Sequence, residues 1–138
     1  MATIKHLFHI AAPQQAVYDA ISTINGLKGW WTLNITGDDS PGGTLAFRFN
    51  GMGPDFKVVS LEPGKSIAWE CTAGFPDWIG TKVTISLDQN EGKTRVRFEH
   101  NGFAQTDDNF AACSFSWGRY MESLRQLCQT GNGNPFGA

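Results

Sequence analysis

The side chain best suited to acid–base chemistry in this sequence is His100, because an unperturbed imidazole titrates near neutral pH. His100 ends a run of alternating residues and shares its phase with Val96 and Phe98, which predicts that it faces the protein interior. There it could exchange a proton with a bound molecule. Alternatively, and more commonly for a buried histidine, it hydrogen-bonds a loop carbonyl or a helix start and holds Asn101–Gln105 in place.

A catalytic partner for His100 would have to be a carboxylate that faces the same interior. Glu70 and Glu99 fall on the outward phase of their strands, which leaves Asp55 and Asp77 in loops. One hypothesis is a small enzyme of the cyclase or hydratase type, with His100 as the acid–base group and Asp77 assisting. The sequence GFPDW around Asp77 is also typical of a turn, and no nucleophile elbow, phosphate-binding glycine loop or dinucleotide fingerprint is found. We therefore expect a binding protein rather than an enzyme.

The histidines and cysteines do not have the spacing of a metal site. His6 and His9 are three residues apart on a predicted strand and point to opposite faces, and the sequence has no CxxC, HxxxH or HExxH pattern. Cys113 and Cys128 would lie about 22 Å apart along one helix, which is too far for a disulfide. We expect no metal ion and no cofactor, and we interpret all three cysteines as small apolar groups in a reducing compartment.

Charge and composition narrow the class of partner. The net charge is −2, from 11 basic and 13 acidic residues scattered along the chain, so neither a nucleic acid nor an anionic membrane is an expected partner. The apolar stretch at the amino terminus is short and is interrupted by Lys5, His6 and His9, which predicts neither a signal peptide nor a membrane span. These features predict a cytoplasmic protein whose partner is a small organic molecule.

The element that organises the chain is a long helix predicted over Thr106–Thr130. Thr106 is the expected N-cap and Gly131 the expected left-handed stop. At about 1.5 Å per residue the helix would be about 37 Å long and would cross the whole domain, so it needs a curved surface to lie in. Its inward face recurs at three- and four-residue steps and comprises Phe110, Cys113, Ser114, Trp117, Tyr120, Met121, Leu124, Leu127 and Cys128.

The chain before this helix is predicted to be β-structure, apart from one short helical region. In that region PQQAVYDAIS, with Pro13 at a first helical position, predicts an amphipathic helix, and TINGLKG predicts a second, broken turn. The predicted strands are Thr3–Ile10, Leu33–Thr36, Thr44–Asn50, Asp55–Leu61, Ser66–Thr72, Ile79–Asp88 and Lys93–His100. Joined by short hairpins, they form a seven-stranded antiparallel sheet, and the fold class is α+β.

Alternation along the strands predicts one aromatic, apolar face and one charged face. The strand Asp55–Leu61 is ambiguous, because Phe56 and Val58 share one face whereas Val59 and Leu61 share the other. In the other strands the inward residues are Leu45, Phe47, Phe49, Ile67, Trp69, Cys71, Val83, Ile85, Leu87, Val96, Phe98 and His100.

Connectivity gives the two ends of the sheet different characters. Successive hairpins alternate between the ends of a meander, so Gly51–Pro54, Ala73–Trp78 and Asn101–Gln105 gather at one end with Trp30–Trp31. That end is rich in aromatic residues, which predicts a hydrophobic mouth with Trp30, Trp31 and Trp78 at its entrance. The expected ligand site comprises Trp31, Phe47, Phe49, Phe56, Trp69, Trp78, Phe98, His100, Phe110, Cys113, Ser114 and Trp117. The alternative is that these rings simply fill the core.

The order of these elements resembles the START or birch-pollen-allergen superfamily, also called SRPBCC. The likeness is carried by IAAPQQAVYDAIS leading to GWW, by FEHNGF and by SWGRYMESLRQLCQTGNGNPF, which together span nearly the whole chain. Within the superfamily the sequence is similar to the family named after the activator of heat-shock-protein-90 ATPase. The resemblance implies a helix-grip (START-like) fold: a curved seven-stranded sheet wraps around the C-terminal helix, two short helices lie between strands 1 and 2, and a cavity separates sheet from helix.

The resemblance implies a function less directly than a fold, because this fold carries lipid binders, hormone receptors, cyclases and chaperone co-factors. We expect residues 1–131 to form a single START-like domain and residues 132–138 to form a loose tail, which Phe136 could anchor. The preferred hypothesis is a module that binds a small hydrophobic or aromatic molecule. The alternatives are the enzyme that uses His100 and a protein-interaction or chaperone co-factor module, with a homodimer as one form of it.

Overall fold

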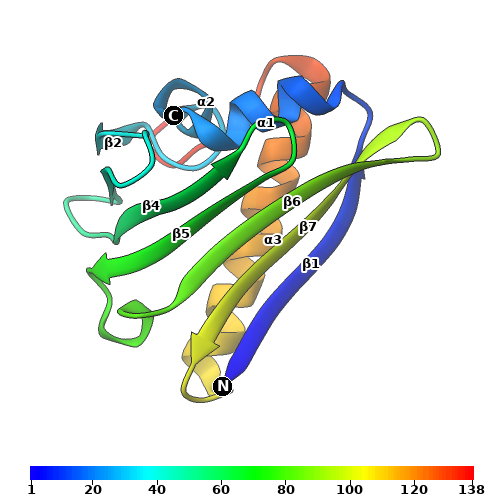
Figure 1. Cartoon of the computed structure of the whole chain (residues 1–138). Helices are drawn as coiled ribbons and strands as arrows, with labels where there is room; N and C mark the ends of the chain where they lie inside the picture. The colour runs from blue at the N-terminus through cyan, green and yellow to red at the C-terminus, as the bar shows by residue number, and fades with distance from the viewer.

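A computed structural model describes residues 1–138 as one curved sheet with three α-helices and a 3₁₀-helix, η1 (Figure 1). The strands are β1 (Ala2–Ile10), β2 (Asn34–Gly37), β3 (Thr44–Arg48), β4 (Asp55–Glu62), β5 (Ser66–Ala73), β6 (Lys82–Asn90) and β7 (Lys93–Phe103). The helices are α1 (Gln14–Ser22), α2 (Ile24–Lys28), η1 (Pro76–Trp78) and α3 (Asp108–Thr130). The predicted α+β class and helix-grip architecture are confirmed.

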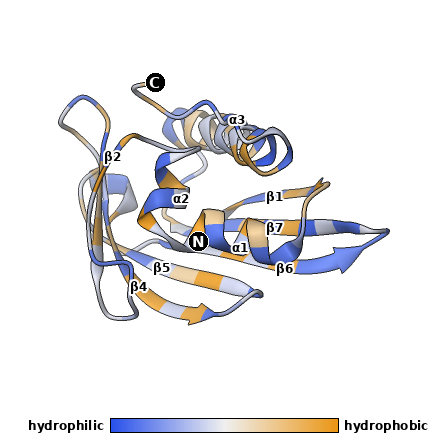
Figure 2. Ribbon diagram, turned by 90° about the horizontal axis from the view of Figure 1, so that it is seen from above, coloured by the Kyte–Doolittle hydropathy of each residue, from blue (hydrophilic) through white to orange (hydrophobic).

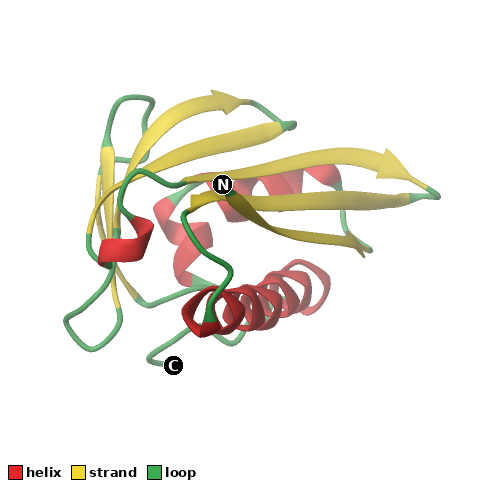
Figure 3. Cartoon of the chain, turned by 90° about the horizontal axis from the view of Figure 1, so that it is seen from below, coloured by secondary structure: helices red, strands yellow, loops and turns green.

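The seven strands pair antiparallel in the order β1-β7-β6-β5-β4-β3-β2. This is the predicted meander, with the first strand joined to the last. Figure 3 shows α3 lying across the open side of the curved sheet. No helix of the fold is both long and apolar enough to span a membrane.

Side-chain alternation along the strands is confirmed, and it appears as bands of hydropathy along β5 in Figure 2. Trp69, Phe98 and His100 are among the fully buried inward residues. In β4 the register shifts between Val58 and Ser60, so Val58 is buried whereas Val59 is half exposed. This bulge explains the ambiguous pattern, because an extra residue moves the following side chains to the opposite face.

Helix α3 begins one residue later than a Thr106 cap would place it. Asp107 is the N-cap, and its carboxylate accepts a hydrogen bond from the Phe110 N–H at 3.0 Å. Thr106 was therefore the wrong capping residue, although aspartate performs the same task. Gly131 ends the helix in the left-handed region, with φ 85°, as predicted.

The two short helices fill the space between β1 and β2, as the pattern predicted. Pro13 is the N-cap of α1 rather than its first helical residue, and Val17 and Ile21 are buried below it. The hydroxyl of Thr23 accepts a hydrogen bond from the Gly26 N–H at 3.0 Å and so begins α2.

The C-terminal tail is held rather than loose. The Phe136 N–H donates to the Trp31 carbonyl at 2.8 Å, and the Leu33 N–H donates to the Phe136 carbonyl at 3.1 Å. The ring of Phe136 meets that of Phe49 at a centroid distance of 5.3 Å. The tail therefore supports the segment that carries Trp31, and Phe136 is its anchor.

Candidate functional site

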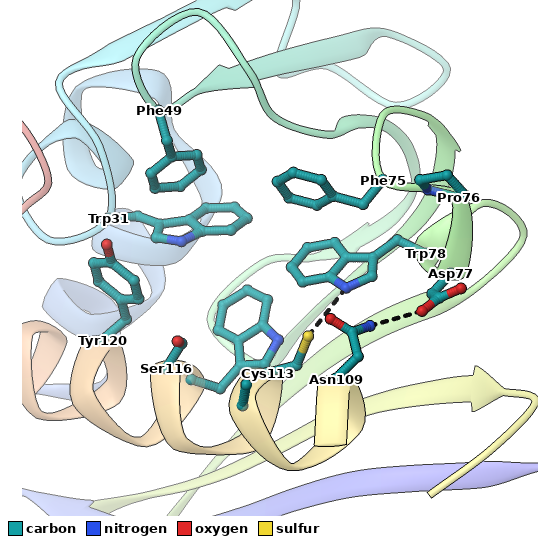
Figure 4. Close-up of a pocket in the computed structure, with 12 residues that line it drawn as sticks. Trp31, Phe49, Phe75, Pro76, Asp77, Trp78, Asn109, Cys113, Ser116 and Tyr120 are labelled. Carbon is teal, nitrogen blue, oxygen red and sulfur yellow. Dashed lines mark hydrogen bonds between the residues drawn. The ribbon is translucent and has the colours of Figure 1, made fainter. Parts of the chain in front are cut away.

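A pocket of about 550 Å³ lies between the first turns of α3, the loop around η1 and the segment after α2 (Figure 4). We call it the aromatic pocket. Its lining residues are Trp31, Phe49, Phe75, Pro76, Asp77, Trp78, Asn109, Ala112, Cys113, Ser116, Trp117 and Tyr120. It lies at the end of the sheet where the connectivity predicted a hydrophobic mouth.

Trp31 forms the rigid wall of the aromatic pocket. Its backbone N–H donates to the Leu27 carbonyl at 2.9 Å, which fixes the backbone just after α2. Its ring stacks parallel to Trp69 at 6.3 Å and packs on Trp117 at 4.8 Å and Phe47 at 4.3 Å. Trp31 is only 2% exposed, so this wall is set by the core before any ligand arrives.

The opposite wall is the loop around η1, which side-chain bonds tie to α3. The Trp78 indole N–H donates to the Cys113 sulfur at 3.3 Å, and the Asp77 carboxylate accepts from the Asn109 amide at 2.8 Å (Figure 4). Trp78 also stands edge-on to His100 at a centroid distance of 4.7 Å. Both walls are therefore held in place, as expected of a preformed binding site.

The polar groups of the aromatic pocket are few and stay uncharged, apart from Asp77. Burial raises the pKa of the Cys113 thiol, so this group is a poor nucleophile. Burial likewise raises the pKa of Tyr120, which keeps its hydroxyl protonated. The arrangement can stack and orient a flat molecule, and it offers no activated nucleophile.

Five of the twelve predicted site residues line the aromatic pocket: Trp31, Phe49, Trp78, Cys113 and Trp117. Five others lie in the fully buried core, where they support the walls without lining them: Phe47, Phe56, Trp69, Phe98 and His100. Phe110 packs on Phe103 at 5.2 Å instead. Ser114 faces β1, where its carbonyl is 3.2 Å from the ring nitrogen Nε2 of His6.

Trp30, predicted at the entrance, is also a core residue. It is completely buried, and its indole N–H donates to the Ala20 carbonyl at 2.8 Å. The prediction for Trp30 was wrong because neighbouring residues after α2 point in different directions, and only the second tryptophan reaches the pocket.

The prediction also left out several lining residues of α3. Asn109, Ala112 and Ser116 recur at three- and four-residue steps beside the apolar face, and Tyr120 continues them. These small or polar residues leave room next to the buried stripe. The spacing of these residues therefore indicates one face of α3. The sequence alone does not show that the pocket lies against this face.

His100 is held in a continuous chain of hydrogen bonds that runs from Trp117 to the Trp78 carbonyl. The Trp117 indole N–H donates to His100 Nδ1 at 3.0 Å, so the proton of the neutral ring is on Nε2. Nε2 then donates to the Thr81 hydroxyl oxygen at 2.7 Å, and that hydroxyl donates to the Trp78 carbonyl at 2.5 Å. Every polar atom of the imidazole is satisfied, and His100 does not line the aromatic pocket. The chain connects the loop around η1 to α3, which is the structural role weighed for His100 from the sequence.

The titration of His100 should make the fold less stable in mild acid. Burial lowers the pKa of His100 to about 3, whereas an imidazole in an unfolded chain titrates near 6.5. Between these values the unfolded chain binds one proton more than the folded chain, so the free energy of unfolding decreases as the pH falls. From pH 7 to pH 5 we expect a loss of about 2 kcal/mol in urea denaturation. An equal loss in a His100→Gln variant would contradict this assignment.

No three His, Cys, Asp or Glu side chains are gathered as a bound metal ion would require. The carboxylate of Asp77 is bonded to Asn109, and His100 is enclosed by Thr81 and Trp117. The two groups of the hypothetical enzyme are thus not brought together at one surface.

Comparison with known proteins gives three findings. Residues 11–129 match the family described as Activator of Hsp90 ATPase homolog 1-like protein. The Aha1 dimer from Colwellia psychrerythraea, whose solution structure is known, is 38% identical, with a TM-score of 0.89 over 96% of this chain and 100% of that chain. No curated protein matches the chain significantly.

More distant structures share the fold alone. A protein from Staphylococcus saprophyticus is 16% identical, with a TM-score of 0.79 over 97% of each chain. CalU16 from Micromonospora echinospora is 19% identical, with a TM-score of 0.76 over 96% of this chain and 76% of that chain.

Proposed function

The chain belongs to the family of Activator of Hsp90 ATPase homolog 1-like proteins, and we propose that it binds a small hydrophobic or aromatic molecule between the sheet and α3. This family lies within the SRPBCC superfamily, whose helix-grip fold is compatible with such a ligand. The observation that carries the proposal is the aromatic pocket itself, which combines about 550 Å³ of space with walls fixed by the core. Its volume lies within the range usual for small-molecule sites.

A screen of thermal stability tests the proposal. Ligands that bind only the folded state raise its stability by about 2.7 kcal/mol at a hundredfold excess over the dissociation constant. We expect flat aromatic compounds to raise the melting temperature, and fatty acids of long chain to do so less, because the rings leave a compact space. Failure of every compound in both classes to raise the melting temperature would refute the proposal.

Two other roles are less well supported. A cyclase or hydratase that used His100 would have no access to it from the pocket, since His100 is enclosed in the core. A chaperone co-factor role is supported by names alone, those of the matching family and of the similar Aha1 protein. We place the protein in the cytoplasm, a proposal supported by its three free cysteines.

A homodimer is the partner arrangement favoured by a specific observation, namely that the similar Colwellia protein is a dimer. We propose the same state for this chain. Multi-angle light scattering should then give twice the chain mass of 15.1 kDa at micromolar concentration. A mass that stays at one chain across the accessible concentrations would exclude it.

A further inference from the structure

The indole N–H of Trp31 is a hydrogen-bond donor without a partner in the protein. The N–H groups of Trp30, Trp78 and Trp117 each donate to a protein atom, whereas those of Trp31 and Trp69 donate to none. Of these two, only Trp31 lines the aromatic pocket. Asp55 Oδ1 is the one completely buried side-chain atom without a hydrogen-bond partner, so the Trp31 N–H is not sealed in the core. It is open to the pocket that Trp31 lines, where an occupant can accept its hydrogen bond.

Two hydroxyl groups face the same space. Figure 4 shows the nitrogen of Trp31 on the edge of its ring that is turned towards α3, with the hydroxyls of Ser116 and Tyr120 on that helix. Neither hydroxyl makes a hydrogen bond to the rest of the protein, and both residues line the aromatic pocket. The hydroxyl of Tyr120 stays protonated, since burial raises its pKa. Three donors thus surround one region between aromatic walls.

The charge of the lining excludes an anion as the natural acceptor for these donors. Asp77 is the only charged residue among the lining residues, and it is negative. No lysine or arginine side chain lines the pocket to balance a carboxylate or phosphate. A neutral oxygen, as in a ketone, quinone or amide carbonyl, matches the donors without a charge to bury.

We propose that the ligand of the aromatic pocket is a neutral, planar aromatic carbonyl compound, whose oxygen accepts a hydrogen bond from the Trp31 indole N–H. The inference rests on the proposed binding function and adds the chemical class of the ligand. The ring system lies beside Trp31, Trp117 and Phe49, which line the pocket. The hydroxyls of Ser116 and Tyr120 are the second and third donors to the same oxygen or to another oxygen on the ring.

The test compares 9-fluorenone with fluorene, which has the same ring skeleton with a CH₂ group in place of the carbonyl. Isothermal titration calorimetry or tryptophan fluorescence measures the dissociation constant of each with the whole chain. Fluorene is the more apolar compound, so a pocket that merely excludes water binds it more tightly. Recognition of the carbonyl reverses the order, and we expect fluorenone to bind about ten times more tightly.

A Trp31→Phe variant, which keeps a ring but removes the N–H, should lose this preference while still binding fluorene. The comparison on the unaltered protein stands even where the variant unfolds. If both compounds bind and fluorene binds as tightly or more tightly, the carbonyl inference is overturned and the proposed function stands. If neither binds but other apolar compounds do, the inference again fails alone. If no compound binds, both are overturned.

Discussion

Replacing His100 by alanine is expected to lower the free energy of unfolding by about 3–5 kcal/mol. The substitution opens a cavity at a completely buried position and removes the acceptor of the Trp117 N–H and the partner of the Thr81 hydroxyl. A buried donor left without a partner costs about 1–3 kcal/mol on its own. Since domains of this size are stable by only about 5–15 kcal/mol, the variant should be folded with a narrow margin.

Urea denaturation at pH 7 measures this effect, and His9→Ala is the matched control. His9 is half-buried on β1, and its ring nitrogen Nε2 is 3.2 Å from the side-chain oxygen of Asn90. Its loss should cost about 1 kcal/mol or less. Equal costs for the two variants would show that the buried hydrogen-bond chain does not hold the loop around η1 to α3.

Replacing Ser116 by tryptophan is expected to weaken ligand binding about 100-fold or more, which corresponds to about 2.7 kcal/mol. Ser116 lines the aromatic pocket from α3, and its side chain points into that space in Figure 4. A bulky ring there occupies the volume that the ligand needs. Because Ser116 is exposed to solvent, the fold should keep its stability within about 0.5 kcal/mol.

The matched control is Ala111→Trp, which adds the same ring at an exposed position of α3 that does not line the pocket. Its dissociation constant for 9-fluorenone should equal that of the unaltered protein in titration calorimetry. If the Ser116→Trp variant bound 9-fluorenone as tightly as this control, the ligand would bind at another surface.

The order and faces of the strands could be predicted because burial acts on alternate residues. Trp69 and Phe98 were correctly predicted to face the interior, since each lies on the same face of its strand as other apolar residues. The bulge at Val58 could not be located from the sequence. One extra residue reverses the alternation after it, so apolar residues fall on both faces of the strand and neither face stands out as the buried one. The cap of α3 could not be chosen either, because threonine and aspartate are both common N-cap residues. The choice between Thr106 and Asp107 depends on the path of the chain between β7 and α3.

The candidate site was predicted only in outline. Alternation separates inward from outward side chains, but it does not say whether an inward ring such as Phe47 packs into the core or borders a space. That distinction comes from the curvature of the sheet and from the distance between the loop around η1 and α3. Ala112 and Ser116 mark the space by their small size, and the resemblance to the helix-grip fold supplied the expectation of a cavity.

Whether the aromatic pocket holds the ligand can be measured from the indole signals of the five tryptophans. The measurement is a two-dimensional ¹H–¹⁵N spectrum recorded during titration with 9-fluorenone. We expect large shifts for the indole signals of Trp31, Trp78 and Trp117, which line the pocket, and small shifts for Trp30 and Trp69, which do not. Shifts that are absent from all five signals at saturating ligand, or that are largest at Trp30 and Trp69, would contradict it.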